Sequence, residues 1–226
     1  MLGLGVRPEL RRLVRGAHGL RPAALLVVAS LALAGCVSGE PAPSIVMLSP
    51  ITQAPIGVRD TAYNPVRPAP DLKLTDQDGQ PFDLASLRGT PVFVYFGYTH
   101  CPDVCPTTLA DLRAAIQTAG LPAKVVFVTI DPARDTAPWI KTYLDAFKAG
   151  FIGLTGTADQ IAAAAGPWGV AYHAQPADST GNYAMIHTSD VYLVDAAGML
   201  RNRIFFGAKS PLIADLLRSV SGGSGG

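Results

Sequence analysis

The sequence predicts an α/β fold with a central mixed sheet flanked by helices and an N-terminal hairpin extension. Apolar runs at 92–96 and 125–130 have the length and continuity of buried strands, and a segment with helical periodicity separates them. A strand pair and a closing helix follow at 190–220. This order of elements is typical of a thioredoxin-like fold, in which a strand, a helix and a second strand come early and a hairpin and a helix come late. A flavodoxin-like sheet, the alternative, would end on a parallel strand.

The first half of the folded region contains a hairpin, a strand and a helix. The hairpin is predicted at 71–84, around the turn sequence Asp-Gln-Asp-Gly. The strand at 92–96 is apolar throughout, as expected for a strand buried on both faces. The helix ends at a Gly-Leu-Pro sequence, and its apolar positions at helical spacing are Leu109, Leu112 and Ile116.

The second half alternates strands and helices before it ends in a strand pair and a helix. Thr136 and Pro138 are typical of a helix start, and Thr157 is the expected N-cap of the next helix. Gly166-Pro167 is expected to stop that helix. The predicted elements are a strand at 125–130, a helix from 136 to about 148, a strand at 151–154, a helix at 157–165, strands at 190–194 and 199–206, and a helix at 210–220.

Composition excludes several classes of protein. Hydrophobic residues make up 49% of the chain and charged residues 15%, which excludes a disordered chain. No apolar run of about twenty residues occurs in the last 190 residues, so a polytopic membrane protein is also excluded. The net charge is +1, but five arginines and one glutamate give residues 1–35 a charge of +4 and leave −3 on the rest. A mildly acidic body without a basic stripe argues against nucleic-acid binding.

Residues 1–35 have the pattern of a secretory signal peptide. Arginines precede an apolar stretch, 23–34, that is too short to span a bilayer comfortably. The stretch ends in Leu33-Ala34-Gly35-Cys36, which resembles the lipobox of bacterial lipoproteins, so Cys36 is the expected lipidation site. The alternative is an uncleaved anchor helix. Either interpretation places the body in the bacterial cell envelope, at the outer face of the cytoplasmic membrane or in the periplasm.

A proline-rich segment separates this anchor from the predicted domain. Residues 36–70 are interpreted as the lipid anchor and an extended linker, because proline fixes φ and removes ladder donors. Residues 71–220 form the predicted thioredoxin-like domain, and 221–226 are a Gly/Ser tail. The prolines of the linker are at positions 41, 43, 50, 55, 65, 68 and 70.

The chemistry is expected at Cys101 and Cys105, which follow the strand at 92–96. Cys105 is in register with the apolar positions of the next helix, and Cys101 lies one turn earlier and is expected to be more exposed. Thiols at this spacing can form a disulfide, and the helix N-terminus favours their thiolates. Two soft thiolates also suit Cu(I) or Zn(II). A structural disulfide is the simpler alternative, but so short a loop would constrain little of the unfolded chain.

His187 is the expected third ligand among four histidines. His18 falls in the signal, and His100 is expected to be a satisfied surface histidine beside Cys101. Thioredoxin-like folds place the loop before the late hairpin against the cysteine-bearing helix start, where thiol oxidoreductases normally have a cis-proline. This chain has no proline between Pro176 and Asp190 and offers His187 there instead. A neutral imidazole facing two thiolates would complete a trigonal Cu(I) site.

Phe96–Leu109 closely resembles the first signature of the SCO/SenC family of copper chaperones. Val128–Thr136 resembles the family's second block, and the segment around His187 its third; the resemblance covers about 71–220. It implies a thioredoxin fold and binding of copper, as Cu(I) or Cu(II), through residues matching Cys101, Cys105 and His187. Many members have an aspartate directly before the histidine. Here Ile186 stands in that place, which removes a carboxylate able to orient the imidazole.

The resemblance also implies a function and partners. It implies a metallochaperone that delivers copper to the dinuclear centre of cytochrome c oxidase, with that copper-centre subunit as partner. Other copper chaperones and thiol reductants are further candidates. The alternative function is a thiol–disulfide oxidoreductase that keeps target cysteines of the oxidase subunit reduced. The missing cis-proline and the spacing of the cysteine pair favour the metallochaperone.

The second block has a structural interpretation beside a functional one. Asp135 and Thr136 are expected to cap the following helix, and Asp131 to shape the turn before it. The resemblance permits a docking role for Asp135, but capping is favoured. Three aromatic residues are candidates for either a docking surface or the core, the latter being favoured: Tyr98, Trp139 and Trp168.

Overall fold

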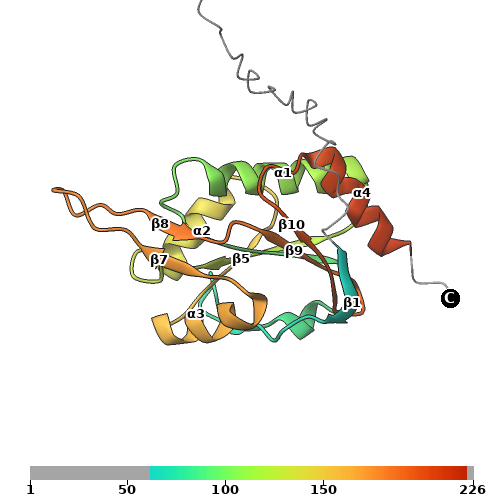
Figure 1. Ribbon diagram of the computed structural model, residues 1–226, viewed down its shortest axis with the longest axis horizontal. Helices are drawn as coiled ribbons and strands as arrows, with labels where there is room; N and C mark the ends of the chain where they lie inside the picture. The colour runs from blue at the N-terminus through green and yellow to red at the C-terminus, as the bar shows by residue number, and fades with distance from the viewer. Residues whose placement is uncertain (1–61, 223–226) are drawn as a thin grey trace, which may run out of the picture. The chain divides into compact units, whose positions relative to one another are not determined.

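A computed structural model describes residues 62–222, which contain one large sheet and a separate hairpin (Figure 1). The strands of the large sheet are β1 (Ala62–Pro68), β2 (Lys73–Asp76), β3 (Pro81–Asp83), β4 (Val92–Gly97), β5 (Lys124–Thr129), β6 (Ile152–Thr155), β9 (Val191–Val194) and β10 (Met199–Ile204). They lie in the order β1-β10-β9-β4-β5-β6-β2-β3. The hairpin consists of β7 (Tyr172–Ala174) and β8 (Met185–His187).

Helices cover both faces of the large sheet. The four helices are α1 (Val104–Ala119), α2 (Ala137–Asp145), α3 (Ala158–Ala165) and α4 (Ser210–Ser221). Figure 1 shows α1 and α4 side by side on one face and α3 on the opposite face. None of the helices in residues 62–222 combines the length and apolar character needed to cross a membrane.

The centre of the sheet confirms the predicted mixed arrangement. Every residue of β4 is buried, because the strand runs parallel to β5 on one side and antiparallel to β9 on the other. β5 in turn runs parallel to β6. The carboxyl end of β4 leads directly into the loop that carries Cys101, so the most deeply buried strand sets the position of the cysteines.

The sheet begins earlier than expected. Residues 62–68 were assigned to the proline-rich linker, but the structure places them in β1, antiparallel to β10. Pro65 and Pro68 are tolerated there because β1 is an edge strand. It has a neighbouring strand on one side only, so fewer of its N–H groups are needed for pairing. The domain boundary predicted at 71 is therefore wrong for this strand. The signal, Cys36, residues 37–61 of the linker and residues 223–226 lie outside the described residues.

The β7–β8 hairpin was also not predicted. Its strands pair only with each other, and Tyr172 lies opposite His187. In Figure 1 the hairpin of β7 and β8 extends away from the large sheet. His187 was expected in a loop, and the structure places it at the end of β8 instead.

Two predicted helix starts differ in their side-chain capping. Thr157 is the N-cap of α3 and forms a capping box with Gln160, as expected of a threonine in this position. Thr136 occupies the N-cap position of α2 but its side chain makes no capping hydrogen bond. Asp135 does not cap α2 either, because its carboxylate is committed elsewhere. α3 ends as predicted at Gly166, where a short 3-10 turn follows.

Candidate metal site

Cys101 and Cys105 lie on either side of the start of α1. Cys105 is in the first turn and is completely buried, whereas Cys101 is only partly buried, as the register predicted. The backbone N–H of Cys105 donates to Cys101 Sγ at 3.4 Å, and both cysteines are free thiols. The helix start therefore positions one sulfur toward solvent and one inside the core.

The two thiols differ in acidity. A hydrogen bond from the Cys105 thiol lowers the pKa of Cys101 to about 5, and backbone N–H groups at the helix start contribute in the same direction. The same hydrogen bond, together with burial, raises the pKa of Cys105. At neutral pH the pair therefore holds one thiolate and one thiol.

His187 approaches the buried sulfur from β8. Its Nε2 lies 3.9 Å from Cys105 Sγ, and its Nδ1 donates to the Thr188 carbonyl at 2.9 Å. That hydrogen bond fixes the tautomer, because a carbonyl can only accept, and leaves the Nε2 lone pair toward the sulfur. Burial lowers the pKa of His187, so the ring is neutral at pH 7. Ile186 is half exposed and takes no part in orienting the ring.

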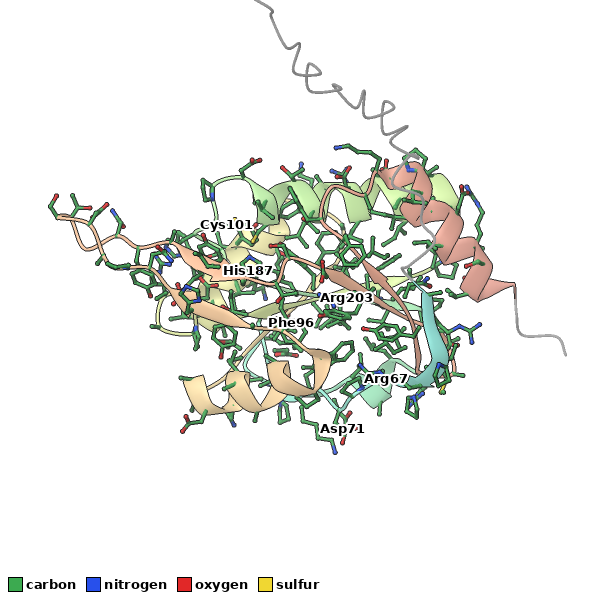
Figure 2. All side chains as sticks on the ribbon, viewed as in Figure 1. Arg67, Asp71, Phe96, Cys101, His187 and Arg203 are labelled. Atoms are coloured by element: carbon green, nitrogen blue, oxygen red, sulfur yellow. The ribbon has the colours of Figure 1, made fainter. Side chains whose placement is uncertain are left out.

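An open groove leads from solvent to these groups. Its volume is about 350 Å³, and the residues around it include Tyr98, Cys101, Val104, Met185, Ile186 and His187. Figure 2 shows Cys101 and His187 at the same end of the sheet, one on the loop before α1 and the other on β8. Within residues 62–222, no three His, Cys, Asp or Glu side chains already enclose a metal position.

Two tyrosines surround the sulfurs and the imidazole. The Tyr95 hydroxyl donates to Cys105 Sγ at 3.3 Å, and burial raises the pKa of Tyr95, so this donor keeps its proton. The Tyr98 ring meets His187 edge-on, with 5.9 Å between the ring centroids. Tyr98 is buried, which confirms the core interpretation for this aromatic residue.

A clasp of three residues, Asp131, Arg134 and Tyr183, holds the hairpin that carries His187. Asp131 accepts hydrogen bonds from Arg134 Nε at 2.6 Å and from the Tyr183 hydroxyl at 2.8 Å. Arg134 also donates to the Tyr183 carbonyl at 2.9 Å, and its guanidinium lies 3.5 Å from the Tyr183 ring centroid. Asp131 thus does more than shape a turn, because it ties the hairpin to the end of β5.

Asp135 fixes the loop that precedes Cys101. Its fully buried carboxylate accepts from the backbone N–H of Thr99 at 3.0 Å and from the Thr99 hydroxyl at 2.6 Å. It also accepts from the Thr129 hydroxyl at 2.7 Å, which joins this loop to β5. The capping role expected of Asp135 is therefore wrong, since three donors of the loop and the strand occupy its oxygens.

The remaining candidate residues lie outside this cluster. His100 stacks on Trp139 and pairs with Asp135, as expected of a satisfied surface histidine. Trp139 is half exposed, whereas Trp168 is buried in the core. His173 is exposed on β7, where its ring hydrogen-bonds with Gln175.

Residues 62–221 match the sequence profile of the SCO1/SenC family. The chain belongs to the SCO1/SenC family. Among its relatives is a protein of Stutzerimonas stutzeri provisionally named a copper-binding protein, 40% identical over 161 residues, which are 68% of this chain and 75% of that protein. An SCO2-like protein of Rickettsia felis is 36% identical over 152 residues, or 66% of this chain and 74% of that one.

Solved structures of other SCO proteins share the fold of this SCO1/SenC domain. The copper-bound ScoI of Bradyrhizobium japonicum has 32% identity and a TM-score of 0.60, over 68% of this chain and 99% of that chain. The copper-bound ScoI of Arabidopsis thaliana has 28% identity and a TM-score of 0.64, over 68% of this chain and 98% of that chain. The predicted thioredoxin-like architecture and the predicted family are thereby confirmed.

Proposed function

We propose that the chain is a copper chaperone that holds its cargo between Cys101, Cys105 and His187. One observation carries this proposal: a neutral imidazole turns its lone pair toward Cys105 Sγ, and Cys105 is hydrogen-bonded to the Cys101 thiolate. Two thiolates and an imidazole are a soft ligand set that suits Cu(I). Relatives with copper bound, and a relative named for copper binding, support the choice of metal.

The proposed acceptor is the copper-centre subunit of cytochrome c oxidase. The SCO1/SenC family is linked to assembly of this oxidase, and a structural relative is described as a member of a family of cytochrome c oxidase assembly proteins. The groove supports delivery by ligand exchange, because an incoming ligand can reach the Cys101 and His187 side while Cys105 stays buried.

The test of copper binding is an anaerobic Cu(I) titration of the reduced full chain, with metal counted per protein. One Cu(I) per chain is expected, and Cys101→Ser or Cys105→Ser should abolish the site. His187→Ala should weaken binding by roughly 10- to 100-fold, the loss measured for residues that merely support metal ligands. His173→Ala is the matched control, because His173 is exposed and lies opposite Ile186, on the other face of the hairpin from His187. A damaging His173→Ala with a silent His187→Ala would contradict the ligand set.

The second candidate function is a thiol–disulfide oxidoreductase. The low pKa of Cys101 favours it, because a thiolate attacks a target disulfide and expels one target thiolate. Attack by Cys105 would then release the second target thiolate and leave a Cys101–Cys105 disulfide. The two functions are separated by mixing the chain with the isolated copper-centre domain of the oxidase. Copper-loaded chain should transfer Cu(I) to a reduced domain, measured as metal bound to each protein after the two are separated, whereas an oxidoreductase would reduce an oxidised domain without metal.

We also propose that the folded domain works at the outer face of the cytoplasmic membrane, tethered through Cys36. The arginines, the short apolar stretch and the Leu-Ala-Gly-Cys sequence support this location. A tether would keep the groove within reach of a membrane-bound acceptor, since the prolines before β1 in the sequence predict an extended linker.

A further inference from the structure

Met185 provides a third sulfur near the proposed copper site. It lines the groove together with Cys101 and His187, and it stands two residues before His187 on β8. Side chains alternate between the two faces of a strand, so Met185 and His187 share one face. The exposure of the side chains is consistent with this alternation, because Met185 and His187 are both partly buried, whereas Ile186 between them is half exposed.

The position of Met185 is fixed by its neighbours on two sides. Its strand partner in the hairpin is Ala174. Its main chain also hydrogen-bonds the Tyr98 side chain, which packs edge-on against His187. The main chain of Met185 is therefore fixed close to Tyr98 and His187, while the flexible methionine side chain can adopt several rotamers within the groove.

The chemistry of the groove gives this thioether a use. Cys105 is inaccessible, so copper must enter and leave on the side of Cys101, His187 and Met185. A thioether is a soft, neutral donor that suits Cu(I), and it carries no proton that the metal must displace. It can therefore add a bond to copper without adding charge.

We infer that Met185 Sδ is a fourth, weakly held copper ligand on the solvent side of the site. The inference rests on the proposed function, because it requires Cu(I) at Cys101, Cys105 and His187. Met185 then holds copper while an acceptor approaches through the groove, and it is the first protein ligand to be displaced. A methionine that only fills space beside Tyr98 would make no bond to the metal.

Selenomethionine labelling of the full chain tests the bond directly. The chain has four methionines, and a selenium bonded to copper is distinguished from sulfur by X-ray absorption at the copper edge. A copper–selenium contribution is expected in the labelled chain loaded with one Cu(I). It should be lost in Met185→Leu and retained in Met199→Leu, the matched control on β10 and outside the groove. Met185→Leu should also weaken Cu(I) binding about tenfold against a competing chelator, the low end of losses at supporting residues.

The outcomes separate this inference from the proposed function. Full copper loading without a copper–selenium contribution would overturn the role of Met185 and leave the chaperone proposal standing. Retention of that contribution in Met185→Leu would overturn it as well, by assigning the bond to another methionine. A chain that takes up no Cu(I) would overturn both proposals together.

Discussion

The pKa values of Cys101 and Cys105 are shifted in opposite directions, although only one helical turn separates the two residues. Because the pKa of Cys101 is lowered to about 5, its thiolate is present above that pH and is lost as the pH falls through it. Labelling of the metal-free chain with iodoacetamide should therefore have its midpoint near pH 5 at Cys101, while buried Cys105 stays unlabelled. Mass spectrometry of the labelled peptides gives both values.

A matched variant tests the cause of this acidity. The largest contribution comes from the Cys105 thiol, so Cys105→Ala should move the labelling midpoint of Cys101 upward. Free thiols titrate near pH ~8.5. A midpoint near that value in the unaltered chain would contradict the geometry of the pair.

The three proposed ligands also predict how many protons copper displaces. Near pH 7, Cys101 is already a thiolate and His187 is already neutral, because burial lowers its pKa, whereas the raised pKa of Cys105 keeps its proton in place. Binding should therefore release about one proton per Cu(I), and apparent affinity should fall about tenfold per pH unit as the pH drops. A pH-indicator titration in weak buffer measures the release, and two protons per copper would contradict the assignment.

At the scale of elements, two helix starts form a natural comparison. Thr157 caps α3 through a reciprocal hydrogen-bond pair with Gln160, whereas Thr136 occupies the same position on α2 without such a bond. Thr157→Ala should therefore lower the free energy of unfolding by about 1 kcal/mol. Thr136→Ala, at an exposed side chain, should change it by less than about 0.5 kcal/mol. Urea denaturation of both variants measures the difference, and equal losses would contradict it.

Some strands of this fold can be predicted from the sequence, and others cannot. Strands β4 and β5 were predictable because burial on both faces requires continuous apolar runs. The β7–β8 hairpin pairs only with itself and none of its six residues is fully buried, so they carry no such run. β1 was missed because its prolines, typical of a linker, are also tolerated at a sheet edge.

The candidate site was predictable only in part. The spacing of the cysteines and the missing proline identified three side chains that the structure brings together. The Thr188 carbonyl that orients His187 leaves no trace in a sequence, since every residue has a carbonyl. Tyr95 was hidden in an apolar run, and Asp135 looked like a helix cap because it stands next to one. Contacts between distant segments bring these residues to the candidate site, and a sequence does not display such contacts.

At the scale of the whole molecule, the proposed tether has its own test. If Cys36 carries lipid, Cys36→Ser should release the chain from membranes or block its processing, because a single thiol holds the anchor. Membrane fractionation and the mass of the mature chain measure both effects. Unchanged retention and unchanged mass would favour an anchor helix, and Ser38→Ala, two residues away in the linker, serves as the control.

The two outer strands of the sheet bear on how the protein behaves when copies are crowded together. An exposed edge with free N–H groups invites strand addition by another chain, which is a common route to aggregation. β1 carries Pro65 and Pro68, and β3 is three residues long and begins with Pro81. Each proline removes a donor that an incoming strand would need. Neighbouring copies at high concentration would therefore find no continuous ladder at either edge, which protects the sheet from edge-to-edge polymerisation.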